Sequence, residues 1–354
     1  MAPIRHDGPP GYALDRPPVR NVNQGGARGI PPRRRRLLYM NGGTNGPAHG
    51  PWLVYHAPLM RVDLDKYRQA GRINAEARRR ALEALAPGVR YVDILDQAED
   101  YIRSEGAELA FPAQVSVNQV AAHDCCGPED ERTFSDGDVI KLDFGVHVDG
   151  CIADGASTRE LGDRHGSLLE ASRQALEAAI ALVRPGRKIR EIAAAIQKTM
   201  RDLDHHPVSN LTGHGIAPYT IHCTPSIPNV PEGTTGVLKE GMMICIEPFA
   251  TTGKGIVLEK GRAEVFGARR KLKAPKHVDS GVVDQIVARR GLPFSRRELA
   301  RAHGNEVADR SLKDLMRVGA VFGYPPLVEQ GPAMVAQFEH TMYVGPDGTE
   351  VMTR

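Results

Sequence analysis

Cysteine and aromatic residues are scarce in this chain, which has 5 Cys, 1 Trp and only 5% Phe, Trp and Tyr among 354 residues. The five cysteines are odd in number and lack CxxC spacing, which excludes a disulfide framework and does not indicate a thiolate zinc site. No apolar run approaches the length of a membrane span, and the N-terminus lacks the apolar core of a signal peptide. These absences predict a protein with reduced thiols in the cytoplasm. The length and composition predict one or two domains, and a monomer is the default expectation.

Lysine is missing from residues 1–59, which hold eight Arg, two Asp, ten of the 26 Pro and nine of the 37 Gly. No helical or strand period persists there, so we expect a disordered extension. The arginine run 33–36 could contact ribosomal RNA or another acidic surface, or could be a solvated tail. A third hypothesis is that translation starts at Met60, where folded patterning begins, and that the extension is not part of the natural protein.

Apolar and polar residues alternate over 140–148, within the stretch VIKLDFGVHVDGCIADGAS, and this period of two predicts a half-buried strand. The Asp-Gly pair at 149–150 is a preferred two-residue hairpin turn, so a second strand should return beside the first. The turn brings Asp143 and Asp154 onto one face, diagonally across the hairpin. Two such carboxylates repel each other unless a cation lies between them. A solvated strand face is the alternative.

Two parts of the chain repeat the order helix, Pro-Gly turn, helix. The first has helical patterns over 64–85 and 91–104, and the second reads LLEASRQALEAAIALVRPG followed by RKIREIAAAIQKTMRDL. The segments PGVRYVDILDQAEDYI and PGRKIREIAAAIQKTM align with an offset of 98 residues. We interpret this as an internal duplication, with two halves of a helix pair plus strands that pack as a pseudo-symmetric unit.

Residues 266–323 differ from their surroundings because they are basic and helical in pattern, as in VVDQIVARR, SRRELARAHG and RSLKDLMRVG. The pattern predicts a small helical insertion, which leaves 60–265 and 324–354 as the main domain. A helix-turn-helix that reads DNA is the alternative. The interleaved acidic residues and the lack of an evident recognition face favour the structural insertion.

Five residues in Gly- or Pro-rich strand contexts are candidate metal ligands: Asp143, Asp154, His214, Glu247 and Glu339. Each one taken singly could be a solvated or hydrogen-bonded structural residue. Together, four carboxylates and one imidazole suit two divalent first-row ions a few ångströms apart, and Mn, Fe, Co and Zn all accept such an oxygen-rich set. The sequence therefore predicts a dinuclear metal centre without naming the metal.

Six signatures then carry a resemblance to a known family: FPAQVSVNQVAAH, KLDFGVHVDGCIAD, LTGHGIAPYTIH, IEPFATTGKG, YPPL and AQFEHT. In this order, over residues 60–354, the chain resembles the methionine aminopeptidases, specifically the type II branch in its archaeal-like short form. The separation of 92 positions between Glu247 and Glu339 matches that branch, since type I enzymes lack the helical insertion. The resemblance implies the α+β pita-bread fold, an antiparallel sheet with flanking helices and pseudo-twofold symmetry.

The resemblance also implies an activity and a division of roles among the ligands. The expected reaction is removal of the N-terminal methionine from nascent polypeptides and peptides, with a small second residue preferred. Asp143 would chelate one of two divalent metals, Asp154 and Glu339 would bridge both, and His214 and Glu247 would complete one site.

The implied mechanism uses a water whose pKa the two metals lower, so that hydroxide exists near neutral pH. Glu247 would shuttle its proton to the leaving amine. His123 and His222 would donate hydrogen bonds to the scissile carbonyl and the tetrahedral oxyanion. The substrate's free α-amine would bind at the metal and acidic end. The implied methionine pocket consists of Phe111, Ile221, Tyr324 and Gln337. Gln114 departs from the family, because some relatives carry Gly there.

Two other functions use the same fold. Prolidase and aminopeptidase P share the ligand types, but they carry a separate N-terminal domain that residues 1–59 cannot replace, and their motifs around the ligands differ. A binding module that has lost its metals should lack ligands, whereas all five and both histidines are present here. We therefore favour the enzyme. Cys223 and Cys245 lie beside His222 and Glu247 and are expected to have packing roles.

Overall fold

A hairpin of two ten-residue strands forms the centre of the first half of the chain. The computed structural model describes residues 63–269 and 271–354. In it, β3 (Val139–Val148) pairs antiparallel with β4 (Cys151–Glu160) along its whole length. Asp149 and Gly150 form the turn with φ angles of 50° and 86°, both left-handed, as a tight hairpin of this twist requires. The predicted hairpin is confirmed.

Both faces of this hairpin are covered, so the prediction of a half-buried strand was wrong. Helix α1 (Leu64–Ala84) packs on one face, where the Asn74 amide donates hydrogen bonds to backbone carbonyls of both strands. Gly155 permits this approach, since a Cβ there would lie 2.8 Å from Asn74 Oδ1. The other face, which carries Asp143 and Asp154, meets strands of the second half of the chain. A two-sided burial of this kind depends on distant segments, which strand periodicity does not reveal.

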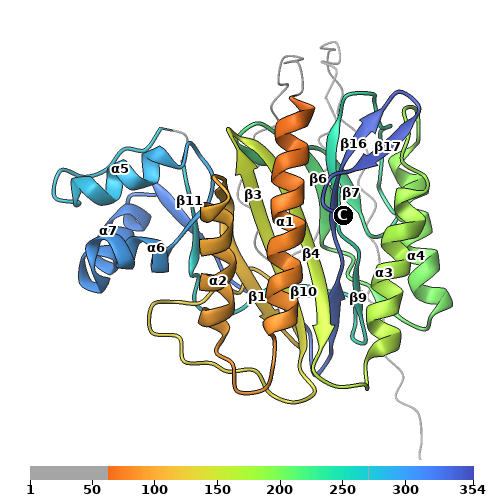
Figure 1. Cartoon of the computed structure of the whole chain (residues 1–354), viewed down its shortest axis with the longest axis horizontal. Helices are drawn as coiled ribbons and strands as arrows, with labels where there is room; N and C mark the ends of the chain where they lie inside the picture. Colours follow the sequence, from red (N-terminus) through yellow and green to blue (C-terminus); the bar gives the residue numbers. More distant parts are fainter. Residues whose placement is uncertain (1–62, 270) are drawn as a thin grey trace, which may run out of the picture. The chain divides into compact units, whose positions relative to one another are not determined.

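The two helix pairs repeat as the sequence suggests (Figure 1). Helices α1 and α2 (Tyr91–Ser104) belong to the first half, and α3 (Gly166–Ile180) and α4 (Ile189–Asp202) to the second. Helices α2 and α4 both have 14 residues, and their first residues are 98 positions apart, which is the offset read from the sequence. Each pair contributes an apolar stripe to the core of its own half.

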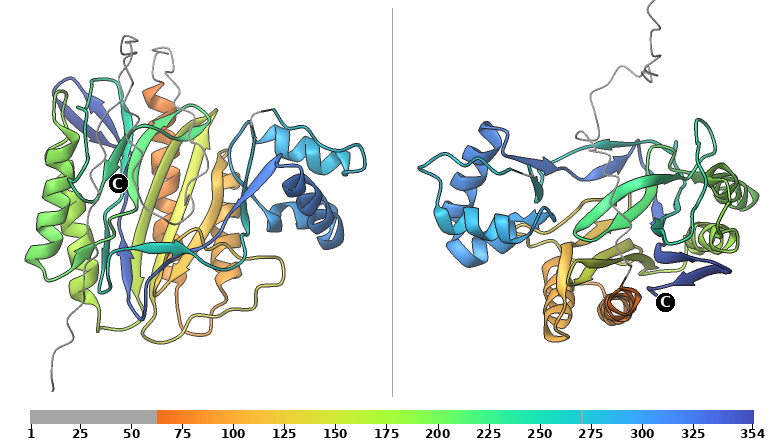
Figure 2. Two further views of the ribbon diagram at one scale, coloured as in Figure 1. Left: turned by 180° about the vertical axis from the view of Figure 1, so that it is seen from behind. Right: turned by 90° about the horizontal axis from the view of Figure 1, so that it is seen from above.

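The strands form five antiparallel sheets of three or five strands within the described residues. Figure 2 shows them from behind, with α1 on their far side. The first-half sheet has the order β1-β3-β4, with β1 at Glu108–Val117. The five-stranded sheet of the second half has the order β17 (Gly348–Val351), β16 (His340–Gly345), β8 (Met243–Ile246), β6 (Thr212–Ala217), β7 (Thr220–Pro228). Two smaller sheets are β10 (Val257–Glu259), β14 (Leu327–Glu329), β2 (Val120–Ala122) and β15 (Val335–Gln337), β9 (Phe249–Thr251), β5 (His206–Pro207).

Three helices lie between β11 (Val265–Ala268) and β13 (Val321–Tyr324) in sequence and beside α2 in space (Figure 1). They are α5 (Ser280–Ala288), α6 (Arg296–His303) and α7 (Asn305–Arg317), and the sheet β12 (Phe294–Ser295), β11, β13 supports them. The guanidinium of Arg297 is almost fully buried and donates to Asp96 and Glu99 of α2 at 2.6 Å each. This buried ion network attaches α6 to the first half of the chain.

The predictions for residues 1–59 and for a start at Met60 lie outside the described residues. In the part of the chain that is described, no helix has both the length and the apolar character that crossing a bilayer requires.

Candidate metal centre

The five predicted ligands come from both halves of the chain and converge. Asp143 on β3 lies opposite Ala156 on β4, and Asp154 lies opposite Gly145, so both carboxylates leave the same face of the hairpin. The other ligands come from the second half: His214 from β6, Glu247 from the residue after β8, and Glu339 from the residue before β16.

Backbone and hydroxyl contacts join the two sheets at this point. The backbone N–H of Glu339 donates to the Ala156 carbonyl at 3.0 Å. The Thr341 hydroxyl on β16 accepts from the Asp154 N–H at 2.7 Å and donates to the Asp154 carbonyl at 2.8 Å. These bonds hold Glu339 against the hairpin, so the two sheets share one set of acidic side chains.

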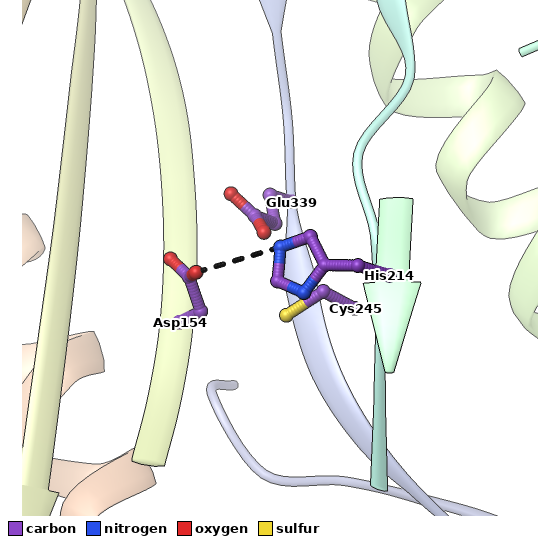
Figure 3. A group of neighbouring side chains, drawn as sticks. All are labelled: Asp154, His214, Cys245 and Glu339. Atoms are coloured by element: carbon purple, nitrogen blue, oxygen red, sulfur yellow. Dashed lines mark ion pairs between the residues drawn. The ribbon is translucent and has the colours of Figure 1, made fainter. Parts of the chain in front are cut away.

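The polar atoms of the cluster lie close together but mostly beyond good hydrogen-bond distance. His214 Nε2 lies 3.8 Å from Asp154 Oδ2 and 3.6 Å from Glu247 Oε1. Gln337 Nε2 lies between three carboxylates, 3.4 Å from Asp143 Oδ2, 3.5 Å from Glu247 Oε2 and 3.3 Å from Glu339 Oε2. Figure 3 shows Asp154, Glu339 and His214 directed toward one another from three strands. The spacing leaves room for ions between the groups.

Burial strongly favours the neutral forms of these side chains. It raises the pKa of Asp143 to about 6, and the pKa values of Asp154, Glu247 and Glu339 lie well above their ordinary range, first because of burial and then because of the neighbouring carboxylates. Burial lowers the pKa of His214 to about 4. The neutral imidazole can bind a cation through its free nitrogen lone pair. The carboxylates cannot all ionise by themselves, and a divalent cation between them would stabilise their ionised forms.

Buried oxygens without hydrogen-bond partners support the fit to metal ions. Among the described residues, the buried side-chain atoms without a partner include Asp143 Oδ1, Asp154 Oδ1 and Glu339 Oε1. A buried carboxylate oxygen that accepts no hydrogen bond carries a large desolvation cost. A bound cation would remove that cost, and the oxygen-rich donor set suits divalent first-row ions.

The two predicted histidines flank the cluster. The His222 ring on β7 lies 4.2 Å from the His214 ring, centroid to centroid, at 76°. His123 follows β2, and its ring meets the Tyr324 ring edge-on at 5.7 Å. Its backbone has φ +65°, and its N–H donates to Gln114 Oε1 at 2.8 Å. Gln114 lies opposite Asp143 across β1 and β3, so this side chain links His123 to a strand that carries a ligand.

The four predicted pocket residues separate into two environments. Phe111 and Ile221 belong to one buried apolar cluster, and the Phe111 ring rests on Gly145, where a Cβ would lie 2.3 Å from the ring. Tyr324 lies beside His123, and Gln337 lies among the carboxylates. The structure thus places two of the four residues in an apolar cluster and the other two beside His123 and the carboxylates.

Cys245 is a neighbour of the site whose place the sequence interpretation missed. Its sulfur and ligand atoms of Asp154, His214 and Glu339 all lie within 4.8 Å of one another, and Figure 3 shows the four side chains together. The sequence did indicate this position. Cys245 and Glu247 are two residues apart, so along β8 their side chains leave the same face of the chain.

Comparisons with known proteins agree with this geometry. The model of metallopeptidase family M24 matches residues 65–346. The methionine aminopeptidase of Archaeoglobus fulgidus is 40% identical over 295 residues, which cover 82% of this chain and 98% of the relative. That of Methanothermobacter thermautotrophicus is 38% identical over 297 residues, with 82% and 98% covered. That of Thermococcus onnurineus is 40% identical over 287 residues, with 80% and 97% covered.

Solved structures support the pita-bread fold at low sequence identity. A methionine aminopeptidase from Thermotoga maritima superposes with a TM-score of 0.62 at 22% identity, covering 83% of this chain and 98% of the other. A thermophilic Arx1 gives a TM-score of 0.74 at 18% identity, covering 83% and 91%. A prolidase from Pyrococcus horikoshii gives 0.55 at 15% identity, but only 62% of the prolidase is covered.

Proposed function

Since the chain belongs to the methionine aminopeptidases of metallopeptidase family M24, we propose that it removes the N-terminal methionine from nascent polypeptides by hydrolysing the first peptide bond. A small second residue is preferred. The observation that carries this proposal is the convergence of two buried and two half-buried carboxylates and one neutral imidazole, with carboxylate oxygens that lack hydrogen-bond partners among the described residues.

Two divalent ions are the cofactor. Asp143, Asp154, His214, Glu247 and Glu339 would hold them. Ions held in this way lower the pKa of a bound water and polarise a carbonyl group. Beside bound ions the carboxylates would be in their ionised form, although burial alone raises their pKa values. Burial keeps the His214 imidazole neutral.

The remaining side chains orient the substrate and move protons. Glu247, whose side chain is 14% exposed, receives the proton of the attacking water and passes it to the leaving amine. His123 and His222 donate hydrogen bonds to the scissile carbonyl oxygen and to the oxyanion that forms from it. The acidic end binds the free α-amine, which restricts cleavage to the N-terminal residue. Phe111, Ile221, Tyr324 and Gln337 hold the methionine.

A peptide-cleavage assay with metal-free protein that has been reconstituted with single metals tests this function. The protein is reconstituted in turn with Mn, Fe, Co or Zn and given Met-Ala-Ser, Met-Lys-Ser and Ala-Pro-Ser. Release of methionine from Met-Ala-Ser alone is expected, because the second residue must be small. Cleavage of Ala-Pro-Ser instead would move the chain to the X-Pro peptidases of this fold. No cleavage with any metal would refute the enzyme and favour a binding module.

The domain division is part of the same proposal. We assign 60–265 and 324–354 to the catalytic domain and 266–323 to a helical insertion, and a separate buried cluster around Phe294, Leu299 and Leu315 supports this division. A monomer in the cytoplasm is the proposed state. Contact with the ribosome through the arginine run 33–36 is likewise a proposal, which rests on charge alone.

A further inference from the structure

We infer that the Cys245 thiol is an additional metal ligand, which shifts the centre toward thiophilic divalent ions such as zinc, cobalt and cadmium. This inference rests on the proposed metal centre. The oxygen-rich set of four carboxylates and one imidazole does not by itself distinguish manganese from zinc. One sulfur donor beside it would do so, because thiolate ligands select softer ions.

The position of the sulfur atom is the first argument. Cys245 Sγ lies within 4.8 Å of a ligand atom from each of Asp154, His214 and Glu339. Around one tetrahedral ion, with metal–sulfur bonds of about 2.3 Å and metal–nitrogen or metal–oxygen bonds of about 2.0–2.2 Å, ligand atoms lie about 3.3–3.7 Å apart. The four atoms would therefore have to approach one another by about 1 Å at most. Small side-chain rotations therefore bring all four groups to bonding distance of a single ion.

The hydrogen-bond directions are the second argument. The Thr341 hydroxyl uses its only proton in the bond to the Asp154 carbonyl, so in its 3.1 Å contact with Cys245 Sγ the thiol is the donor. The same thiol also interacts with the Glu339 carboxylate, with which it can share a hydrogen bond, so the sulfur adjoins a predicted ligand directly. When the sulfur binds an ion, the thiol proton leaves to solvent, and Thr341 still accepts from the Asp154 N–H.

The unpartnered oxygens around the sulfur are the third and independent argument. Asp154 and Glu339 are 3% and 2% exposed, and each has a buried carboxylate oxygen with no hydrogen-bond partner among the described residues. Figure 3 shows the carboxylates of Asp154 and Glu339 and the sulfur of Cys245 grouped around the His214 ring. A thiol that only filled an apolar gap would not need two such oxygens beside it.

Cobalt and cadmium spectroscopy of the full chain tests the inference. Metal-free wild-type protein is titrated with Co²⁺ and with Cd²⁺ while the near-ultraviolet thiolate-to-metal charge-transfer absorption and the visible cobalt bands are recorded. We expect a charge-transfer band in the wild type and none in C245A or C245S. In both variants, affinity for Cd²⁺ should fall about 10- to 100-fold, with Mn²⁺ affinity unchanged.

A matched control uses a second thiol of the same apolar cluster. Cys151 is 7% exposed and belongs to that cluster but not to the candidate ligand group, so C151A should keep the band. Visible cobalt bands without a charge-transfer band in the wild type would overturn the thiol ligand while leaving the metal centre intact. Loss of the band in C151A would also overturn it. No binding of either ion would refute the metal centre itself.

Discussion

Replacing Gln114 by alanine should lower turnover because Gln114 positions His123, and the metal ligands should be unaffected. Gln114 is 6% exposed, and its Oε1 accepts the backbone N–H of His123 at 2.8 Å. His123 is held at φ +65°, a conformation that costs a non-glycine residue about 1 kcal/mol or more and persists only when its surroundings enforce it. The glutamine therefore holds the backbone of His123, and with it the imidazole that we propose contacts the substrate.

The size of the effect follows from this bond. Leaving a buried N–H without its acceptor costs about 1–3 kcal/mol. If the backbone of His123 relaxes instead, the imidazole leaves its orientation, and the transition state loses stabilisation of similar size. At 1.4 kcal/mol per factor of ten, kcat/KM should fall about 5- to 100-fold. The loss should appear in kcat and not in KM, since the proposed His123 contact strengthens as the oxyanion forms.

Steady-state kinetics on Met-Ala-Ser with a double-mutant cycle measures this. Q114A should reduce kcat/KM in the wild type but have no further effect in H123A, because both changes remove the same contribution. Q119A, which removes an exposed amide on the same β1–β2 turn, is the matched control and should match the wild type. Unchanged kcat/KM in Q114A, or a full additional loss in Q114A/H123A, would show that Gln114 does not act through His123.

Three further outcomes follow from the same structure. D154A should abolish turnover yet remain folded by circular dichroism, and full activity in this variant would refute the two-metal assignment. In metal-free protein the raised carboxyl pKa values mean that the folded state keeps protons that the unfolded chain releases. Its thermal midpoint should therefore fall as the pH rises from about 4 toward neutral, and added divalent ion should abolish this slope in differential scanning fluorimetry. R297M leaves the buried carboxylate of Glu99 without its nearest cation and should cost about 3 kcal/mol in urea unfolding. The double variant E99M/R297M should regain most of the lost unfolding free energy, because it removes both charges. Equal destabilisation of R297M and E99M/R297M would contradict a charge effect.

Several features of the site were predictable because their causes are local in sequence. The alternation over 140–148 and the Asp-Gly turn define the hairpin register, so the shared face of Asp143 and Asp154 could be worked out from the sequence. The Pro-Gly turns marked the repeated helix pairs. The Gly- and Pro-rich strand contexts already marked His214, Glu247 and Glu339 as candidates, and the resemblance to methionine aminopeptidases supplied their individual roles.

Other features depend on which strands meet, and the sequence pattern did not reveal them. The hairpin alternates like a half-buried strand, yet α1 covers one face and the strands near β16 cover the other. Gln337 was expected in the methionine pocket and lies among three carboxylates. Cys245 was expected to pack and lies within reach of three ligands.

The sequence by itself determined the elements, the hairpin register and the types of ligand, because turns and periodicity act between residues a few positions apart. Only the tertiary structure decided how the two halves meet, since the bonds from Thr341 to Asp154 and from Glu339 to Ala156 join residues more than 180 positions apart. That meeting buries the carboxylates together and raises their pKa values. It also places the Cys245 sulfur beside these carboxylates. Residues from separate strands thereby form one candidate metal centre.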